Sequence, residues 1–265
     1  MRNPAFRSPA FSATPQAAAP TLTAAQLEEL YAQPSAQRPS TEPMTYQDTL
    51  LKSALTFAIL ITGAVVGWLT AETVPFLWIA AAGVGFVLAL VNTFKREPSA
   101  TLILIYAAAQ GVFLGGISTY FEAMYPGIVA QTVLATFLVV GVTLALFASG
   151  RIRASKTATK IFLVAMVAYL LFSLVNVVLM LTGVNTDPWG LSTSVTIAGI
   201  PLGVILGILA VLMGAYSLVL DFDFIQRGVR NGAPRRYGWS GAFGIMVTVI
   251  WLYVEILRLI AIARR

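Results

Sequence analysis

Hydrophobic residues in this chain occur in long continuous runs rather than in alternation with polar ones. Seven such runs follow a polar N-terminal stretch, and each is close to or above the roughly 20 residues that a helix needs to cross a bilayer. They lie near residues 51–70, 75–94, 100–121, 128–149, 159–182, 195–222 and 238–262. The pattern predicts an all-α membrane protein, with a seven-helix transmembrane domain over residues 47–265.

The first 46 residues have a different composition. They are rich in Ala, Pro, Ser, Thr and Gln, and they contain no apolar run that could serve as a signal peptide. This composition is typical of a disordered tail. One short helix is predicted over residues 23–31, because Thr23 and Gln26 have the spacing of a capping box.

The composition restricts both the environment and the chemistry. Only 11% of the residues are charged, against about 25% in soluble domains, so most of the surface must face the lipid bilayer. The chain has no cysteine and no histidine, which excludes disulfides, thiol nucleophiles, histidine bases and Cys/His metal sites. A Ser-His protease is therefore excluded, and an aspartyl protease would need two facing Asp residues on separate helices. We expect neither enzymatic activity nor a bound cofactor.

The basic residues predict the orientation of the helices. Fourteen of the seventeen lie in the N-terminal stretch or in alternate connections: Arg2, Arg7, Arg38, Lys52, Lys95, Arg96, Arg151, Arg153, Lys156, Lys160, Arg227, Arg230, Arg235 and Arg236. The intervening loops hold none, so the positive-inside rule places the N-terminus in the cytoplasm of a cell inner (plasma) membrane protein. The net charge of +6 thus indicates topology and lipid headgroups as partners, not nucleic acid.

Three arginines do not fit this scheme. Arg258, Arg264 and Arg265 follow at the far end of the seventh run, on the side that should be outside. Either they reach the outer headgroups by snorkelling, or the last segment folds back without crossing.

Glycines recur every four residues in two of the runs. These are Gly111 and Gly115 in the third run, and Gly199, Gly203 and Gly207 in the sixth. Such stripes allow helix backbones to approach closely in lipid. Pro201 lies in the predicted sixth helix and is expected to kink it.

Eight of the eleven acidic residues fall in the tail, in loops or at interfaces, and three remain. Glu255 lies inside the seventh run, so we expect it to be protonated, to pair with Arg258 at i+3, or to line a polar cavity. Asp221 and Asp223 end the sixth run. Because residues two apart on a helix point in different directions, one can face the bundle while the other faces water or Arg227.

Three segments resemble the Bax inhibitor-like (transmembrane BAX inhibitor motif) membrane proteins, and details of composition look like a bacterial branch. They are Asp-Phe-Asp-Phe-Ile at 221–225, Val-Ile-Trp-Leu-Tyr-Val-Glu-Ile-Leu-Arg at 249–258, and Tyr-Ala-Ala-Ala-Gln-Gly-Val-Phe-Leu-Gly at 106–115. The likeness covers about residues 45–265. It implies seven helices with the seventh central, and a calcium leak under pH control.

The family pattern also implies a pair of aspartates that share a proton in the closed state, one ending the sixth helix and one in the seventh. Asp221 matches the first, but the second position falls at Thr248, which departs from the pattern. Thr248 could donate a hydrogen bond to Asp221 and favour its charged form. Asp223 or Glu255 could instead supply the second carboxylate, although Glu255 lies roughly 10 Å along the helix from Thr248.

These observations lead to two alternative functions. The first is a pH-sensitive leak for calcium or other cations, gated by Asp221 and locked by Arg227, with Asp221, Asp223 and Glu255 as weak calcium ligands. The second is a regulatory membrane protein that transports nothing and binds membrane proteases or stress-response partners.

Overall fold

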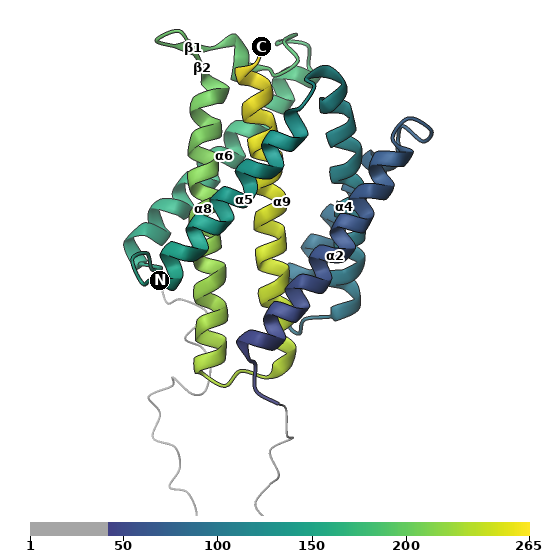
Figure 1. Ribbon diagram of the computed structural model, residues 1–265. Coiled ribbons are helices and arrows are strands. Elements are labelled where there is room, and N and C mark those ends of the chain that lie inside the picture. Colours follow the sequence, from purple (N-terminus) through teal and green to yellow (C-terminus); the bar gives the residue numbers. More distant parts are fainter. Residues whose placement is uncertain (1–41) are drawn as a thin grey trace, which may run out of the picture. The chain divides into compact units, whose positions relative to one another are not determined.

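The computed structural model describes residues 42–265, which form one bundle of long helices (Figure 1). In this part of the chain, seven helices are long and apolar enough to cross a membrane. They are α2 (Tyr46–Thr70), α3 (Leu77–Phe94), α4 (Ala100–Met124), α5 (Ile128–Ala148), α6 (Lys156–Leu181), α8 (Leu202–Arg230) and α9 (Gly238–Ala263). The predicted helix at residues 23–31 lies outside the described residues.

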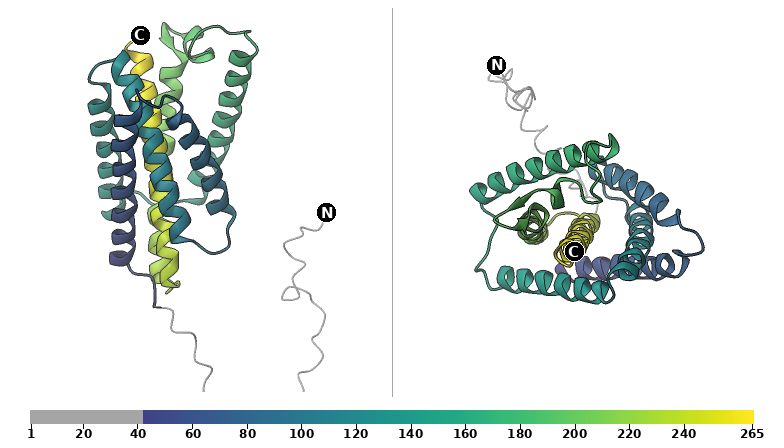
Figure 2. Two further views of the ribbon diagram at one scale, coloured as in Figure 1. Left: turned by 90° about the vertical axis from the view of Figure 1, so that its right-hand side faces the viewer. Right: turned by 90° about the horizontal axis from the view of Figure 1, so that it is seen from above.

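Helix α9 is the central element of the bundle. It packs against α8, α2, α5 and α4, and Figure 2 shows it inside a ring formed by other helices. Met246, Leu252 and Leu257 of α9 are almost completely buried, because neighbouring helices cover several of its faces. The prediction of a seven-helix bundle with a central seventh helix is confirmed.

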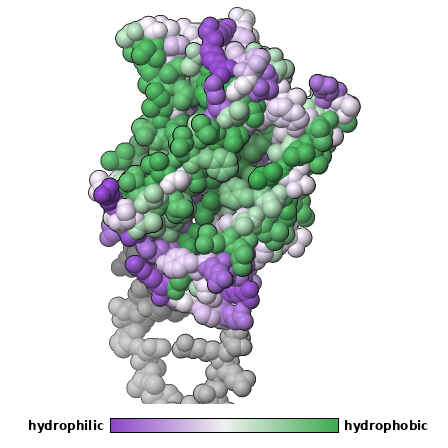
Figure 3. Space-filling view, viewed as in Figure 1, coloured by the Kyte–Doolittle hydropathy of each residue, from purple (hydrophilic) through white to green (hydrophobic). Residues whose placement is uncertain are grey.

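The surface has the polarity that a bilayer requires. On the face shown in Figure 3, hydrophobic side chains cover the middle of the bundle, and hydrophilic ones gather towards its two ends. In a bilayer, backbone polar groups must be satisfied within the segment, which α-helices achieve through their own hydrogen bonds.

Helices α2 and α4 approach each other through glycines. Gly63 and Gly67 of α2 face Gly111 and Gly115 of α4, and a methyl group on Gly115 would collide with the carbonyl oxygen of Ala64. The close packing predicted for the Gly111–Gly115 stripe is confirmed. Its partner stripe on α2 was not predicted.

The sixth spanning helix begins later than predicted and extends past the end of its apolar run. Residues 195–201, predicted to be helical, include a small hairpin of β1 (Thr196–Ile197) and β2 (Ile200–Pro201). Ala198 and Gly199 form its two-residue turn, both with positive φ, as such tight hairpins require. Gly199 was predicted to belong to the glycine stripe of this helix, but it lies in the hairpin turn before the helix begins. Pro201 precedes the helix and does not kink it.

At its other end, α8 continues eight residues beyond the predicted boundary and ends at Arg230. The apolar run stops near residue 222, but Asp223 and Arg227 form an ion pair of 2.9 Å at i+4 that supports the added turns. Asn231 then caps the helix, and Gly232 with φ 62° reverses the chain.

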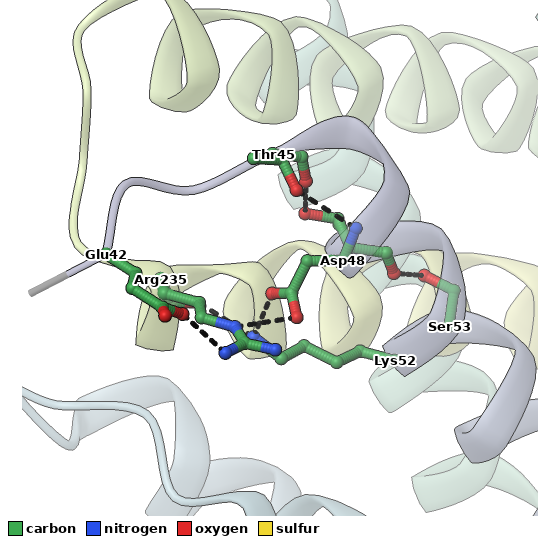
Figure 4. A network of polar contacts seen from close by, with 7 residues as sticks. Glu42, Thr45, Asp48, Lys52, Ser53 and Arg235 are labelled. Carbon is green, nitrogen blue, oxygen red and sulfur yellow. Dashed lines mark hydrogen bonds and ion pairs between the residues drawn. The ribbon is translucent and has the colours of Figure 1, made fainter.

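The chain just before α2 is held against the connection between α8 and α9. Met44 is 2% exposed and donates its backbone N–H to Ala233, and Pro43 forms a β-bridge with Pro234. The Arg235 side chain binds Glu42 and Asp48, and Lys52 binds Asp48 and the Arg235 carbonyl (Figure 4). Residues 42–44, which the sequence assigned to the tail, thus contact the bundle through these hydrogen bonds and ion pairs.

Contacts at the opposite end of the bundle show that α9 runs along its whole length. Arg264 donates hydrogen bonds to the carbonyl of Pro126 and to Gln131, and Arg265 pairs with Asp187 at 2.9 Å. Pro126 and Asp187 lie in two of the connections that hold no basic residue. The alternative in which the last segment folds back is therefore excluded.

Candidate functional site

Asp221 lies on the side of α8 that faces α9, where it meets Thr248. Thr248 is only 5% exposed, and its hydroxyl donates a hydrogen bond of 2.7 Å to Asp221 Oδ2. Ser217, one turn before Asp221, lies 3.2 Å from the Thr248 hydroxyl. A methyl group on Gly244 would lie 2.7 Å from Asp221 Oδ1, so the absence of a side chain there makes room for the carboxylate. The predicted contact between Asp221 and Thr248 is confirmed.

Asp223 points elsewhere, as its spacing from Asp221 predicted. It pairs with Arg227 at 2.9 Å, and the Arg227 side chain is 65% exposed. In the described part of the chain Asp221 forms no ion pair. The structure therefore lacks the expected ion pair between Arg227 and Asp221, because Arg227 pairs with Asp223 instead.

A second polar site lies farther along α9. Glu255, 7% exposed, pairs with Arg258 at 2.7 Å and accepts a hydrogen bond of 2.6 Å from the Tyr169 hydroxyl of α6. Arg258 also donates to the Tyr169 hydroxyl oxygen, and its guanidinium lies 5.7 Å from the centre of the Tyr169 ring. Of the three states expected for Glu255, the structure contains the ion pair with Arg258. Because Arg258 pairs with Glu255, its side chain does not extend to the outer headgroups, contrary to the snorkelling alternative.

The two polar sites are separated along α9. Thr248 and Glu255 are seven residues apart, about 10 Å by helical rise. Leu252 lies between them, fully buried and in contact with Gly214 of α8. Glu255 therefore cannot act as the second carboxylate beside Asp221 in this arrangement.

The three carboxylates proposed as calcium ligands also remain apart. Asp221 contacts Thr248, Asp223 contacts Arg227, and Glu255 contacts Arg258. Among residues 42–265 no group of three or more acidic side chains could hold a metal ion. The site can offer a passing cation one carboxylate with neighbouring hydroxyls, but not the six to eight oxygens of a calcium cage.

Three residues of these sites were not predicted from the sequence. Ser217 and Gly244 complete the surroundings of Asp221, and each lies one turn from a predicted residue, so helical spacing alone could have suggested them. Tyr169 lies on a different helix, and no local pattern connects it with Glu255.

The fold and the site together define a class: a polytopic membrane protein whose central helix buries a charged pair and contacts a carboxylate of its neighbour. A family model described as Bax inhibitor 1 like matches residues 3–265, and the chain belongs to this family. A search of curated proteins found no match. The family resemblance of the sequence is thus confirmed over essentially the whole chain.

Proposed function

We propose that this protein is a pH-sensitive leak pathway for cations, with calcium as the preferred ion and Asp221 as the gate. The observation that carries the proposal is the hydrogen bond between Asp221 of α8 and Thr248 of α9. It joins the central helix to its neighbour through a group whose charge depends on a proton. A change of protonation at this contact can therefore bias how the two helices pack.

The proposed cycle has two states of the Asp221 carboxyl group. A protonated Asp221 is neutral and keeps α8 and α9 together through Thr248 and Ser217. An ionised Asp221 still accepts the Thr248 hydrogen bond, but one hydroxyl does not replace the hydration of a carboxylate. The ionised group therefore draws water and cations to the helix contact, because a charge is poorly tolerated in a dry interior. Flux should therefore rise with the ionised fraction of Asp221. In this chain one carboxylate and one hydroxyl replace the family's pair of aspartates.

We also place the protein in the cell inner membrane, with the basic end in the cytoplasm. This orientation is supported by the basic residues in or beside the connections at one end of the bundle, such as Lys95, Arg153 and Arg236. The rule that basic loops stay inside then assigns the compartment.

Calcium flux in proteoliposomes tests the gate. We expect Asp221→Asn, which cannot ionise, to have low flux that does not vary with pH. Thr248→Asp would place a second carboxylate next to the first, and two close carboxylates retain one proton. Its flux should therefore begin only at a higher pH than that of the parent.

The matched control is Glu97→Gln, which removes a carboxylate that is 59% exposed and pairs with Arg236 outside the helix contact. It should keep the parental flux and pH profile. If Asp221→Asn and Thr248→Asp both behave like this control, Asp221 is not the gate.

A further inference from the structure

Helix α6 is attached to the bundle differently from the other spanning helices. Within residues 42–265 it is the one spanning helix without a single buried residue. Apolar side chains such as Val164, Leu170 and Leu174 are more than half exposed. In a bilayer these side chains contact lipid, so apolar burial does little to fix the position of α6.

The inward side of α6 is a narrow stripe with alternating spacings of three and four residues. It consists of Thr159, Phe162, Met166, Tyr169, Ser173 and Asn176, all partly buried. This is the helical repeat of a single contact seam. Half of its members bond to other parts of the protein through their side chains.

These bonds hold α6 at both ends and in the middle. Near the basic end, the Thr159 hydroxyl lies 2.9 Å from the Tyr216 hydroxyl of α8. In the middle, Tyr169 bonds to Glu255 and Arg258 of α9. Near the opposite end, the Asn176 amide donates to the Trp189 carbonyl, and its oxygen accepts the backbone N–H of Leu191 at 2.7 Å.

Beside the Tyr169 contact the seam is loosely packed. A crevice of about 280 Å³ lies where Met166, Tyr169 and Ser173 of α6 approach Trp251 of α9. A gap forfeits the dispersion contacts that would otherwise hold two helices together. Because helices in lipid associate through packing and interhelical hydrogen bonds, the position of α6 depends mainly on its polar contacts.

We propose that α6 is a movable lateral wall of the bundle, and that Tyr169 is the latch that keeps it closed over the Glu255–Arg258 pair. Release of Tyr169 lets the middle of α6 move outward while Thr159 and Asn176 hold its ends. The movement uncovers the charged pair of α9 from the side of the lipid. This inference does not depend on whether the protein conducts cations.

Spin-label distances in lipid nanodiscs test the latch directly. The chain has no native cysteine, so Leu171→Cys on α6 and Ile105→Cys on α4 give one labelled pair. Both positions are lipid-facing, 56% and 47% exposed, and labels there leave the seam intact. The distance distribution is measured in the parent, in Tyr169→Phe and in Tyr253→Phe.

Tyr253→Phe is a matched control because it also removes a phenolic hydroxyl in the bundle. That hydroxyl bonds to Ser118 of α4 at 2.5 Å and does not contact α6. We expect Tyr169→Phe to add a longer component to the distribution, and Tyr253→Phe to retain the parental one. A parental distribution in Tyr169→Phe overturns the proposal, and so does equal broadening in both variants.

Discussion

Glu255 and Arg258 place two opposite charges inside a bundle that is surrounded by lipid. Their ion pair of 2.7 Å and the Tyr169 hydroxyl give each charge a partner, which makes burial tolerable. The burial also makes each partner sensitive to loss of the other, because an unpaired charge in a dry interior has no water to solvate it.

Removing one member of this pair should destabilise the fold more than removing both. We expect Glu255→Gln to destabilise the protein by about 3 kcal/mol, since it leaves Arg258 buried without a counter-charge. The double variant Glu255→Met/Arg258→Met should recover much of that loss. Thermal unfolding in detergent measures both. Equal stability of Glu255→Gln and the parent would contradict the account.

Asp187 gives a stability effect that depends on pH. The Thr193 hydroxyl, with the Trp189 N–H and Arg265, lowers the pKa of Asp187 from 3.8 to about 2. Because the folded state has the lower pKa, this contribution is fully present above pH 3.8 and is lost as the pH falls towards 2.

The corresponding variant is Asp187→Asn, which removes the charge at every pH. Its melting temperature should be below that of the parent at neutral pH, and the difference should shrink as the pH approaches 2. Melting curves of both proteins over an acid series test this. A difference that stays constant would show that the Asp187 charge does not stabilise the fold.

Helices in this protein are held together in different ways. The α2–α4 pair relies on glycines that bring two backbones into contact, whereas α6 relies on hydrogen bonds from a narrow seam. Both kinds of contact occur because apolar side chains gain no hydrophobic free energy when they move from lipid into the protein. Close backbone contact and polar bonds are the interactions that remain.

The glycine contact can be tested with a single methyl group. Gly115→Ala forces a methyl against the carbonyl of Ala64, and overpacking of this kind costs about 1–3 kcal/mol. Gly141→Ala on α5 is the control, because its added methyl meets no atom within 4 Å. We expect a lower melting temperature only for Gly115→Ala. Equal melting temperatures would mean that the backbones can separate without loss.

At the scale of the whole molecule, the two ends of the bundle differ in charge and in their connections. The chain before α2 and the α8–α9 connection are joined by Arg235 at the basic end. The two arginines after α9 join two loops at the other. Arginines at both ends of the bundle therefore connect segments that are distant in the sequence.

Accessibility of single cysteines checks the orientation. Ser149→Cys lies exposed at the basic end, and Val184→Cys lies at the other end, where the native side chain is 75% exposed. An impermeant maleimide added to intact cells should label only Val184→Cys, and permeabilised cells should show both labelled. The reverse labelling would place the basic end outside.

By itself, the sequence determined the class of protein, the number of spanning helices and the contacts that follow helical spacing. Long apolar runs require helices in lipid, and the i+3 spacing of Glu255 and Arg258 made their pairing one of the three states expected for Glu255. The contact between Asp221 and Thr248 came instead from the family resemblance, since no local spacing joins two helices.

Only the tertiary structure decided the contacts between distant segments. Tyr169 meets Glu255, Gly244 makes room for Asp221, and Arg235 binds Glu42 because the bundle brings these segments together. The structure also decided that residues 195–201 include a hairpin and that α9 runs the whole length of the bundle. Hydrophobicity measures how well a segment fits in lipid, but it carries no information about which side chains face each other.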